Sequence, residues 1–197
     1  MATSEEGVLM TGRLIYLIGP SGSGKDSLLD AAREALAARG CRIVRRVITR
    51  SAEATGEAAQ AVSVGRFEAL QAEGAFALDW FANGLHYGIP VEIDQWLAEG
   101  HDVLINGSRG HLPQARARYP HMSVVLLTVD QAVLRERLQR RARESAEDIE
   151  TRLARNAQFT QGLLADDPEL IVLDNSGPLE QTVGRLMQHL ERADACA

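Results

Sequence analysis

The sequence predicts an α/β fold in which a parallel sheet is flanked by helices on both sides. Strand-like segments alternate with segments whose apolar residues recur at helical spacing. The strand segments are apolar along their whole length, as expected of strands buried on both faces of a parallel sheet. A glycine-rich loop at residues 19–25 separates the first strand from the first helix.

The first half of the chain predicts a small insert in this alternation. We expect a strand at 13–18, a helix at 26–39 that ends at Gly40, and a second strand at 41–47. Residues 49–61 have few large apolar side chains and are expected to form a loop, followed by a short helix at 64–73. Asn83-Gly84, between strands at 75–81 and 85–89, is typical of a type I′ hairpin turn, so the insert is predicted to be antiparallel.

The second half returns to the α/β alternation. It predicts a helix at 91–99, strands at 102–106, 124–129 and 170–173, and a helix from Asp130, its expected N-cap, to 141. A polar break at 143–147, a long helix at 148–164 and a last helix at 178–192 follow. We expect one domain over 13–192, a flexible N-terminus at 1–12 and a loose C-terminus at 193–197.

Composition excludes several classes of protein. The net charge of −6 argues against a nucleic-acid-binding surface. Cys41 and Cys196 are too far apart in sequence for a zinc-binding motif, and two cysteines do not make a disulfide framework. Neither a signal peptide nor a membrane span is apparent, so we expect a cytoplasmic protein that binds neither membrane nor nucleic acid. A homodimer is compatible with the sequence.

The glycine-rich loop predicts an ATP site. It fits the pattern G-x-x-x-x-G-K between a strand and a helix, where backbone amides and the helix N-terminus bind phosphates. Its lysine is the only Lys among 21 basic residues. A lysine acts as a compact point charge on phosphates, unlike the planar guanidinium. The predicted nucleotide-binding residues are Gly19, Pro20, Ser21, Gly22, Ser23, Gly24, Lys25, Asp26 and Ser27.

The residues after the lysine are the candidates for a Mg²⁺ site. A Ser or Thr usually follows the lysine and binds the ion, whereas this chain has Asp26 and then Ser27. The Asp26 carboxylate is a hard oxygen ligand that suits Mg²⁺. It is equally well explained as an acid that stabilises the first turn of the helix, and both interpretations stay open.

Arginines concentrate on two consecutive helices. They are Arg135, Arg137, Arg140, Arg141 and Arg143, followed by Arg152 and Arg155. One interpretation is a lid, at about 137–155, that brings guanidinium groups to the transferring phosphoryl group. The other is a solvated surface paired with Glu136, Glu144, Glu147 and Glu150. Together with the phosphate loop, the pattern favours the lid for Arg141 and Arg152, which we predict to be catalytic along with Lys25.

Residues at strand ends are candidates for binding the phosphoryl acceptor. In open α/β sheets, ligands bind at the carboxyl ends of the strands. Arg50 and Arg109 follow two such ends, Asn106 closes the second strand, and Tyr87 lies on the hairpin. We expect these four residues to bind the acceptor, with the insert at about 50–90 forming part of its site.

From Leu14 to about Leu190 the chain resembles the guanylate-kinase-related phosphotransferases. The matching strings include GPSGSGK at 19–25, TR at 49–50, YG at 87–88 and the spacing of Arg137, Arg141 and Arg152. The resemblance implies that Arg141 lies near adenine and that Arg152 contacts the transferring phosphate. The chain lacks the polar groups of a guanine site, because Leu78 and Ile89-Pro90 stand in their places. It also lacks the family's second phosphate-binding arginine, because Ser51-Ala52-Glu53 follow Arg50. Guanylate is therefore not the expected acceptor.

The chain is also similar, more closely, to the ribose 1,5-bisphosphate phosphokinases of bacterial phosphonate breakdown. GPSGSGKDSLL at 19–29, ANGLHYG at 82–88 and DVLINGSRGHLPQARARY at 102–119 carry this similarity, which includes Asp26. It implies that ATP phosphorylates the 1-phosphate of ribose 1,5-bisphosphate, giving 5-phosphoribosyl 1-diphosphate and ADP. Among the acceptor-side candidates, Asn106 is expected to bind ribose hydroxyls. Two alternatives remain: a nucleoside monophosphate kinase of altered base specificity, and a non-catalytic binding module. The intact loop argues against the module.

Overall fold

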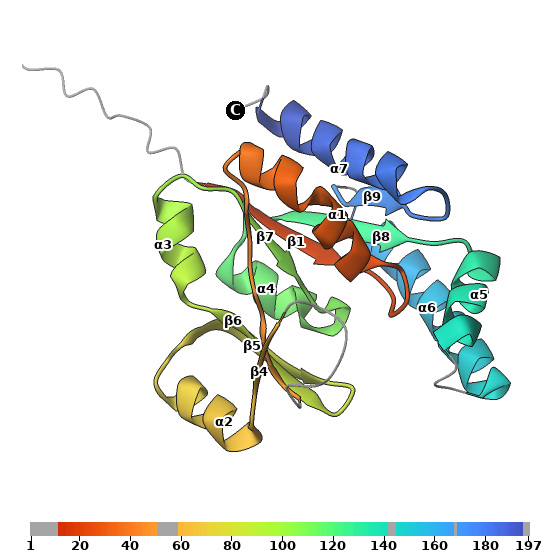
Figure 1. The fold of residues 1–197 in the computed structure, drawn as a ribbon, viewed down its shortest axis with the longest axis horizontal. Helices are drawn as coiled ribbons and strands as arrows, with labels where there is room; N and C mark the ends of the chain where they lie inside the picture. Colours follow the sequence, from red (N-terminus) through yellow and green to blue (C-terminus); the bar gives the residue numbers. More distant parts are fainter. Residues whose placement is uncertain (1–11, 51–58, 142–144, 168, 195–197) are drawn as a thin grey trace, which may run out of the picture.

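Figure 1 shows the computed structural model of the protein, which describes residues 12–50, 59–141, 145–167 and 169–194. A five-stranded parallel sheet has the order β2-β7-β1-β8-β9. Its strands are β1 (Leu14–Ile18), β2 (Arg42–Ile43), β7 (Val103–Asn106), β8 (Ser123–Thr128) and β9 (Ile171–Asp174). This parallel sheet, with helices on both of its faces, confirms the predicted fold class.

Helices cover both faces of this sheet. Ile15 and Leu17 of β1 pack towards α1 (Lys25–Ala38) and α7 (Leu179–Asp194), which lie on one side (Figure 1). Tyr16 and Ile18 point the other way, into a core with α3 (Glu92–Ala98) and α4 (Leu112–Arg118). All five residues of β1 are buried, which is the two-sided burial that the apolar run predicted.

A second, four-stranded sheet forms the insert. Its order is β4-β3-β6-β5, and its strands are β3 (Val47–Thr49), β4 (Gln60–Val62), β5 (Phe76–Ala82) and β6 (Leu85–Pro90). Asn83 and Gly84 both have positive φ, 51° and 77°, which confirms the type I′ hairpin. The hairpin strands β5 and β6 pair antiparallel as predicted, and so do β3 and β6, whereas β4 joins β3 in parallel, so that the insert is a mixed sheet. α2 (Val64–Ala72) follows β4 and fits the predicted short helix.

Other predicted boundaries also needed correction. The strand expected at 41–47 is divided between the sheets: β2 pairs with β7, and β3 pairs with β6 after the chain has crossed between them. Residues 60–62 form a strand because β3 offers them its free edge. The interval 107–123 holds a short 3₁₀ helix, η1 (Arg109–His111), and α4, whose first turn accommodates Pro113.

α5 (Gln131–Arg141) and α6 (Ala146–Asp166) form a helical pair beside the large sheet (Figure 1). They pack through Leu134, Leu138, Ile149 and Leu153, all of which are buried. The Asp130 carboxylate accepts a hydrogen bond from the Ala132 amide at 2.8 Å, which confirms the predicted cap. Arg143, Cys196 and most of the termini that were expected to be loose lie outside the described residues.

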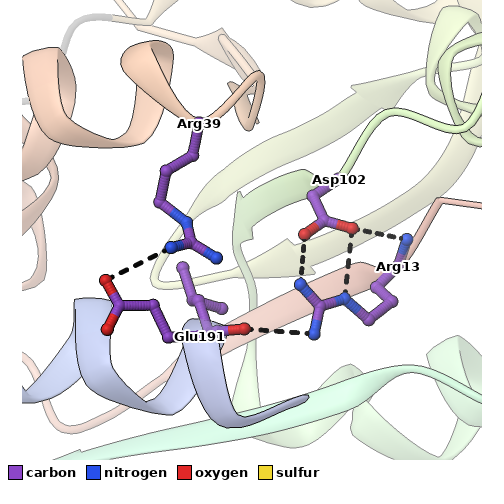
Figure 2. A network of polar contacts seen from close by, with 5 residues as sticks. Arg13, Arg39, Asp102 and Glu191 are labelled. Carbon is purple, nitrogen blue, oxygen red and sulfur yellow. Dashed lines mark hydrogen bonds and ion pairs between the residues drawn. The ribbon is translucent and has the colours of Figure 1, made fainter. Parts of the chain in front are cut away.

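Polar contacts join the ends of distant elements. Arg13 makes a two-pronged ion pair with Asp102 and also donates to the Leu190 carbonyl, as Figure 2 shows. Burial alone would raise the pKa of Asp102, but the hydrogen bonds from Arg13 outweigh burial and hold that pKa below its ordinary value. The network therefore links the starts of β1 and β7 to the end of α7.

None of the helices in the described part of the chain combines the length and the apolar character that a membrane span needs.

Candidate active site

The glycine-rich loop is open and has the backbone geometry that its glycines permit. Gly22 and Gly24 have φ of 94° and 92°, values that disfavour other residues. A Cβ on Gly24 would approach Asn175 Nδ2 to 2.6 Å, and one on Gly22 would lie 3.0 Å from Leu134 Cδ1. The two glycines are thus required both by the backbone and by the packing of α5 and residue 175 against the loop.

Lys25 is the first residue of α1 and its side chain returns over the loop. Its ammonium group donates to the carbonyl oxygens of Gly19 and Pro20, at 2.9 and 3.2 Å. The ammonium therefore lies at the concave loop rather than extending into solvent. This is where a lysine can neutralise the charge of bound phosphates.

Two residues that sequence reasoning did not assign to the loop hold it in place. Asn175, which is 3% exposed, donates through Nδ2 to the Ser23 carbonyl at 2.7 Å. Arg137 donates to the same carbonyl at 3.3 Å and to the Asn175 carbonyl at 2.9 Å. The guanidinium of Arg137 thus joins the loop at residue 23 to residue 175. No sequence signal identifies Asn175, since it is one of many polar residues at strand ends.

A cavity of about 430 Å³ lies beside the loop. Its lining is Gly22, Gly24, Ser27, Arg137, Arg140, Arg141, Asn175, Gly177 and Leu179. The structure thus brings the predicted residue Arg141 to the same cavity as the loop and Ser27. A cavity with loop glycines on one wall and arginines on another suits a polyanion such as a nucleotide triphosphate.

Part of the arginine cluster is paired at the surface instead. Arg135 makes a two-pronged contact with Glu150, at 2.6 and 2.9 Å, that joins α5 to α6. Arg140 pairs with Glu136 at 3.3 Å within α5. The interpretation as a solvated surface therefore describes Arg135 and, in part, Arg140. Arg152 lies half-buried on α6.

The residues proposed for metal binding face different ways. Asp26 Oδ1 accepts a hydrogen bond from Asn106 Nδ2 at 2.9 Å, which places the carboxylate at the end of β7. Ser27 instead lines the cavity beside the loop. Within the described ranges, no cluster of three His, Cys, Asp or Glu residues could hold a metal by itself. One carboxylate at a phosphate loop fits Mg²⁺, which is commonly bound through one or two carboxylates together with nucleotide phosphates.

The acceptor side is built around the end of β7. Asn106, 2% exposed, presents its side chain to Asp26, and its carbonyl accepts from Arg46 Nη1 at 2.8 Å. The Arg46 guanidinium lies 5.0 Å from the ring centre of Tyr87, which stacks on Trp80 at 5.5 Å. Arg46 is a buried cation that the sequence analysis missed. Arg50 follows β3, next to a segment outside the described residues.

Comparisons with known proteins agree with this geometry, although no protein-family model matches the chain. It is 70% identical over 190 residues to ribose 1,5-bisphosphate phosphokinase PhnN of Pseudomonas fluorescens (strain SBW25), covering 95% of this chain and 100% of that protein. Two further proteins of that name are similar over 188 residues. The one from Pseudomonas paraeruginosa (strain DSM 24068 / PA7) is 65% identical, and the one from Azotobacter vinelandii (strain DJ / ATCC BAA-1303) is 62% identical. Each match covers 95% of this chain and 100% of the relative. The chain belongs to the ribose 1,5-bisphosphate phosphokinase family.

A guanylate kinase from Anaplasma phagocytophilum shares the fold of this phosphokinase chain. It superimposes with a TM-score of 0.70 at 19% identity, and the match covers 93% of this chain and 87% of that one. Two departures from a guanine site noted in the sequence are neighbours in the structure. Leu78 and Ile89 pair in register across β5 and β6 and are 5% and 0% exposed. Two buried apolar side chains therefore meet at these positions.

Proposed function

We propose that this protein transfers the γ-phosphoryl group of ATP to the 1-phosphate of ribose 1,5-bisphosphate, giving 5-phosphoribosyl 1-diphosphate and ADP. The observation that carries the proposal is the identity of 62–70%, over 95% of the chain, to three phosphokinases named for this substrate. The open phosphate loop and its ammonium group support the kinase part of the proposal independently of those names.

On the donor side, the loop amides and Lys25 would hold the ATP phosphates. Arg141 is proposed to lie over the nucleotide in the shared cavity, and Arg152 to reach the transferring group when α5 and α6 act as a lid. Asp26 is the proposed Mg²⁺ ligand, with Ser27 nearer the nucleotide. Bound Mg²⁺ supplies positive charge that neutralises the phosphates.

On the acceptor side, the chemistry needs positioning rather than a strong base. The attacking atom is a phosphate oxygen, largely ionised at neutral pH because its second pKa is about 6. This agrees with Asn106, an amide, at the end of β7. Its Nδ2 is engaged by Asp26, and its Oδ1 is buried without a hydrogen-bond partner in the described part of the chain. That oxygen is the proposed acceptor for a ribose hydroxyl. Arg50, Tyr87 and Arg109 are the proposed phosphate ligands.

The buried pair Leu78–Ile89 supports a sugar phosphate over a nucleotide. A purine placed there would lose partners for its ring nitrogens and exocyclic groups, and each unpaired buried polar group costs about 1–3 kcal/mol. Losing several such partners corresponds to a discrimination of roughly 10⁴-fold or more. A nucleoside monophosphate should therefore be a poor acceptor.

An acceptor screen tests the proposal. The protein is incubated with Mg²⁺, γ-labelled ATP and one acceptor at a time: ribose 1,5-bisphosphate, ribose 5-phosphate, or each of the common nucleoside monophosphates. We expect label to enter a diphosphate only with ribose 1,5-bisphosphate, with the product identified by ³¹P NMR, and transfer by Lys25→Ala to be slower by roughly 10²–10³-fold or more. Faster transfer to any nucleotide would overturn the proposed acceptor.

A further inference from the structure

Arg109 and Asn156 form a buried contact between the acceptor side and α6. Arg109 begins η1, three residues after Asn106, and its Nη2 donates to Asn156 Oδ1 at 2.8 Å. Asn156 is only 5% exposed. The ring centre of Phe159 lies 4.6 Å from the guanidinium carbon of Arg109 and covers one face of the group. The contact therefore joins a half-buried guanidinium, backed by an aromatic ring, to a buried amide.

Two donors in this contact have nothing to donate to. Arginine has no acceptor, so the amide oxygen of Asn156 must face Arg109 and its NH₂ group must point elsewhere. That Nδ2 atom and Arg109 Nη1 are both buried and have no hydrogen-bond partner within the described residues. Buried donors in folded proteins are almost always satisfied by protein, water or ligand.

The charge of Arg109 is also uncompensated. In the described ranges its contacts are with Asn156 and Phe159, and neither carries a carboxylate. Burial lowers the pKa of Arg109 below its ordinary value, and the like charge of Arg155 lowers it further. Arg109 is half-buried, and a cation taken even partly out of water normally has a counter-ion. An anion that accepts hydrogen bonds would therefore satisfy both the charge and the two donors.

We propose that Arg109 and Asn156 form a subsite for one phosphate group of the acceptor, with Phe159 backing the guanidinium. This deepens the proposed function and rests on it for the identity of the acceptor. Two phosphate oxygens accept from Arg109 Nη1 and Asn156 Nδ2 while the existing contact between the two residues is kept. Asn156 is thereby a substrate-binding residue on α6.

The position of the pair supports this assignment. Asn156 lies four residues after Arg152 on α6, so the two side chains share a helix face about one turn apart. On the other element, Arg109 follows the strand whose end carries the contact between Asn106 and Asp26. The subsite therefore lies next to the proposed transfer centre, on the side of the acceptor.

Replacement of the amide by a carboxylate gives the sharpest test. In Asn156→Asp the new carboxylate pairs with Arg109 internally and repels a phosphate. We expect the KM for ribose 1,5-bisphosphate to rise by roughly tenfold or more, with the Kd for ATP unchanged. We also expect an equal or higher Tm, because Arg109 gains a counter-ion. Gln158→Glu, the same replacement of an amide by a carboxylate at an exposed position two residues on, should alter neither quantity.

Several outcomes would overturn the subsite. It is refuted if Asn156→Asp leaves the KM unchanged, or if it lowers Tm and weakens ATP binding together, which would indicate a merely structural role. Asn156→Leu, which removes the donor and adds no charge, should raise the KM less than Asn156→Asp does. An equal or larger effect of the leucine would count against a phosphate ligand.

Calorimetry identifies which phosphate is bound. Ribose 5-phosphate, ribose 1-phosphate and ribose are titrated into the wild type and Asn156→Asp. The phosphate whose monoester loses affinity in the variant is the one held here, and equal affinities in both proteins for both monoesters would contradict the proposal. The turnover of the wild type tests the proposed function separately. Should a different phosphorylated acceptor prove preferred, the KM for that acceptor in Asn156→Asp, divided by the KM in the wild type, still tests the role of Asn156.

Discussion

Asn175 is predicted to support the phosphate loop, and Asn175→Ala tests how much the loop depends on it. The side chain makes two buried hydrogen bonds: Nδ2 donates to the Ser23 carbonyl at 2.7 Å, and Oδ1 accepts from Thr182 Oγ1 at 2.9 Å. Truncation removes both. The Ser23 carbonyl keeps the longer bond from Arg137, and the Thr182 hydroxyl keeps a 3.3 Å bond to the Asp174 carbonyl.

The expected loss in the free energy of unfolding of Asn175→Ala follows from these contacts. Two intramolecular hydrogen bonds at about 1 kcal/mol each give a loss of about 2 kcal/mol in the free energy of unfolding. Neither partner is left wholly unsatisfied, so the larger penalty for an orphaned buried group does not apply in full. For a domain of this size, a loss of that kind lowers Tm by about 4–8 °C.

The function of the loop should change with its stability. Without Asn175 the Ser23 carbonyl is held less firmly, so the loop amides are less well ordered for phosphates, and we expect the KM for ATP to rise several-fold, by about 3–10 times. Urea unfolding and steady-state kinetics measure the two effects. Thr182→Val is the matched control, since it removes one bond to Asn175 and leaves the bond to Ser23. It should lower stability and leave the KM for ATP unchanged.

The reasoning would be refuted by either of two results. If Asn175→Ala unfolded at the wild-type urea concentration, the two buried bonds would contribute nothing. If both variants raised the KM for ATP equally, general destabilisation would explain the effect, and Asn175 would have no particular role at the loop.

Three further predictions concern the loop and the polar network. Lys25→Ala should lower kcat by roughly 10²–10³-fold or more with little change in Tm, because a charge at the phosphates is lost; a wild-type rate would refute its role. Asp26→Ala should raise the Mg²⁺ concentration for half-maximal rate by roughly tenfold, whereas Asp30→Ala should not, and equal titrations would contradict metal ligation. Asp102→Asn should cost about 1 kcal/mol at neutral pH by urea unfolding. Because the folded-state pKa of Asp102 is lowered, its contribution is full above about pH 4 and is lost as the pH falls towards that lowered value. A cost independent of pH would contradict the ion pair.

Local patterns determined several elements correctly. The hairpin turn needs positive φ at two adjacent residues, and Asn83-Gly84 is a pair that adopts it readily. The Asp130 cap and the glycine-rich loop are likewise short-range features, whose residue types are restricted by their own backbone. The two-sided burial of β1 was predictable because an apolar run has no polar face to expose.

The sequence by itself thus determined the parallel α/β architecture and the phosphate loop, because each depends on neighbouring residues or on residue type. Only the tertiary structure decided that residues 41–49 divide between two sheets, since pairing partners lie far along the chain. It also decided the roles of Asn175 and Arg46, and it brought Asn156 to Arg109. A polar residue in a sequence carries no sign of its distant partner, and contacts across 47 to 152 positions are fixed by packing alone.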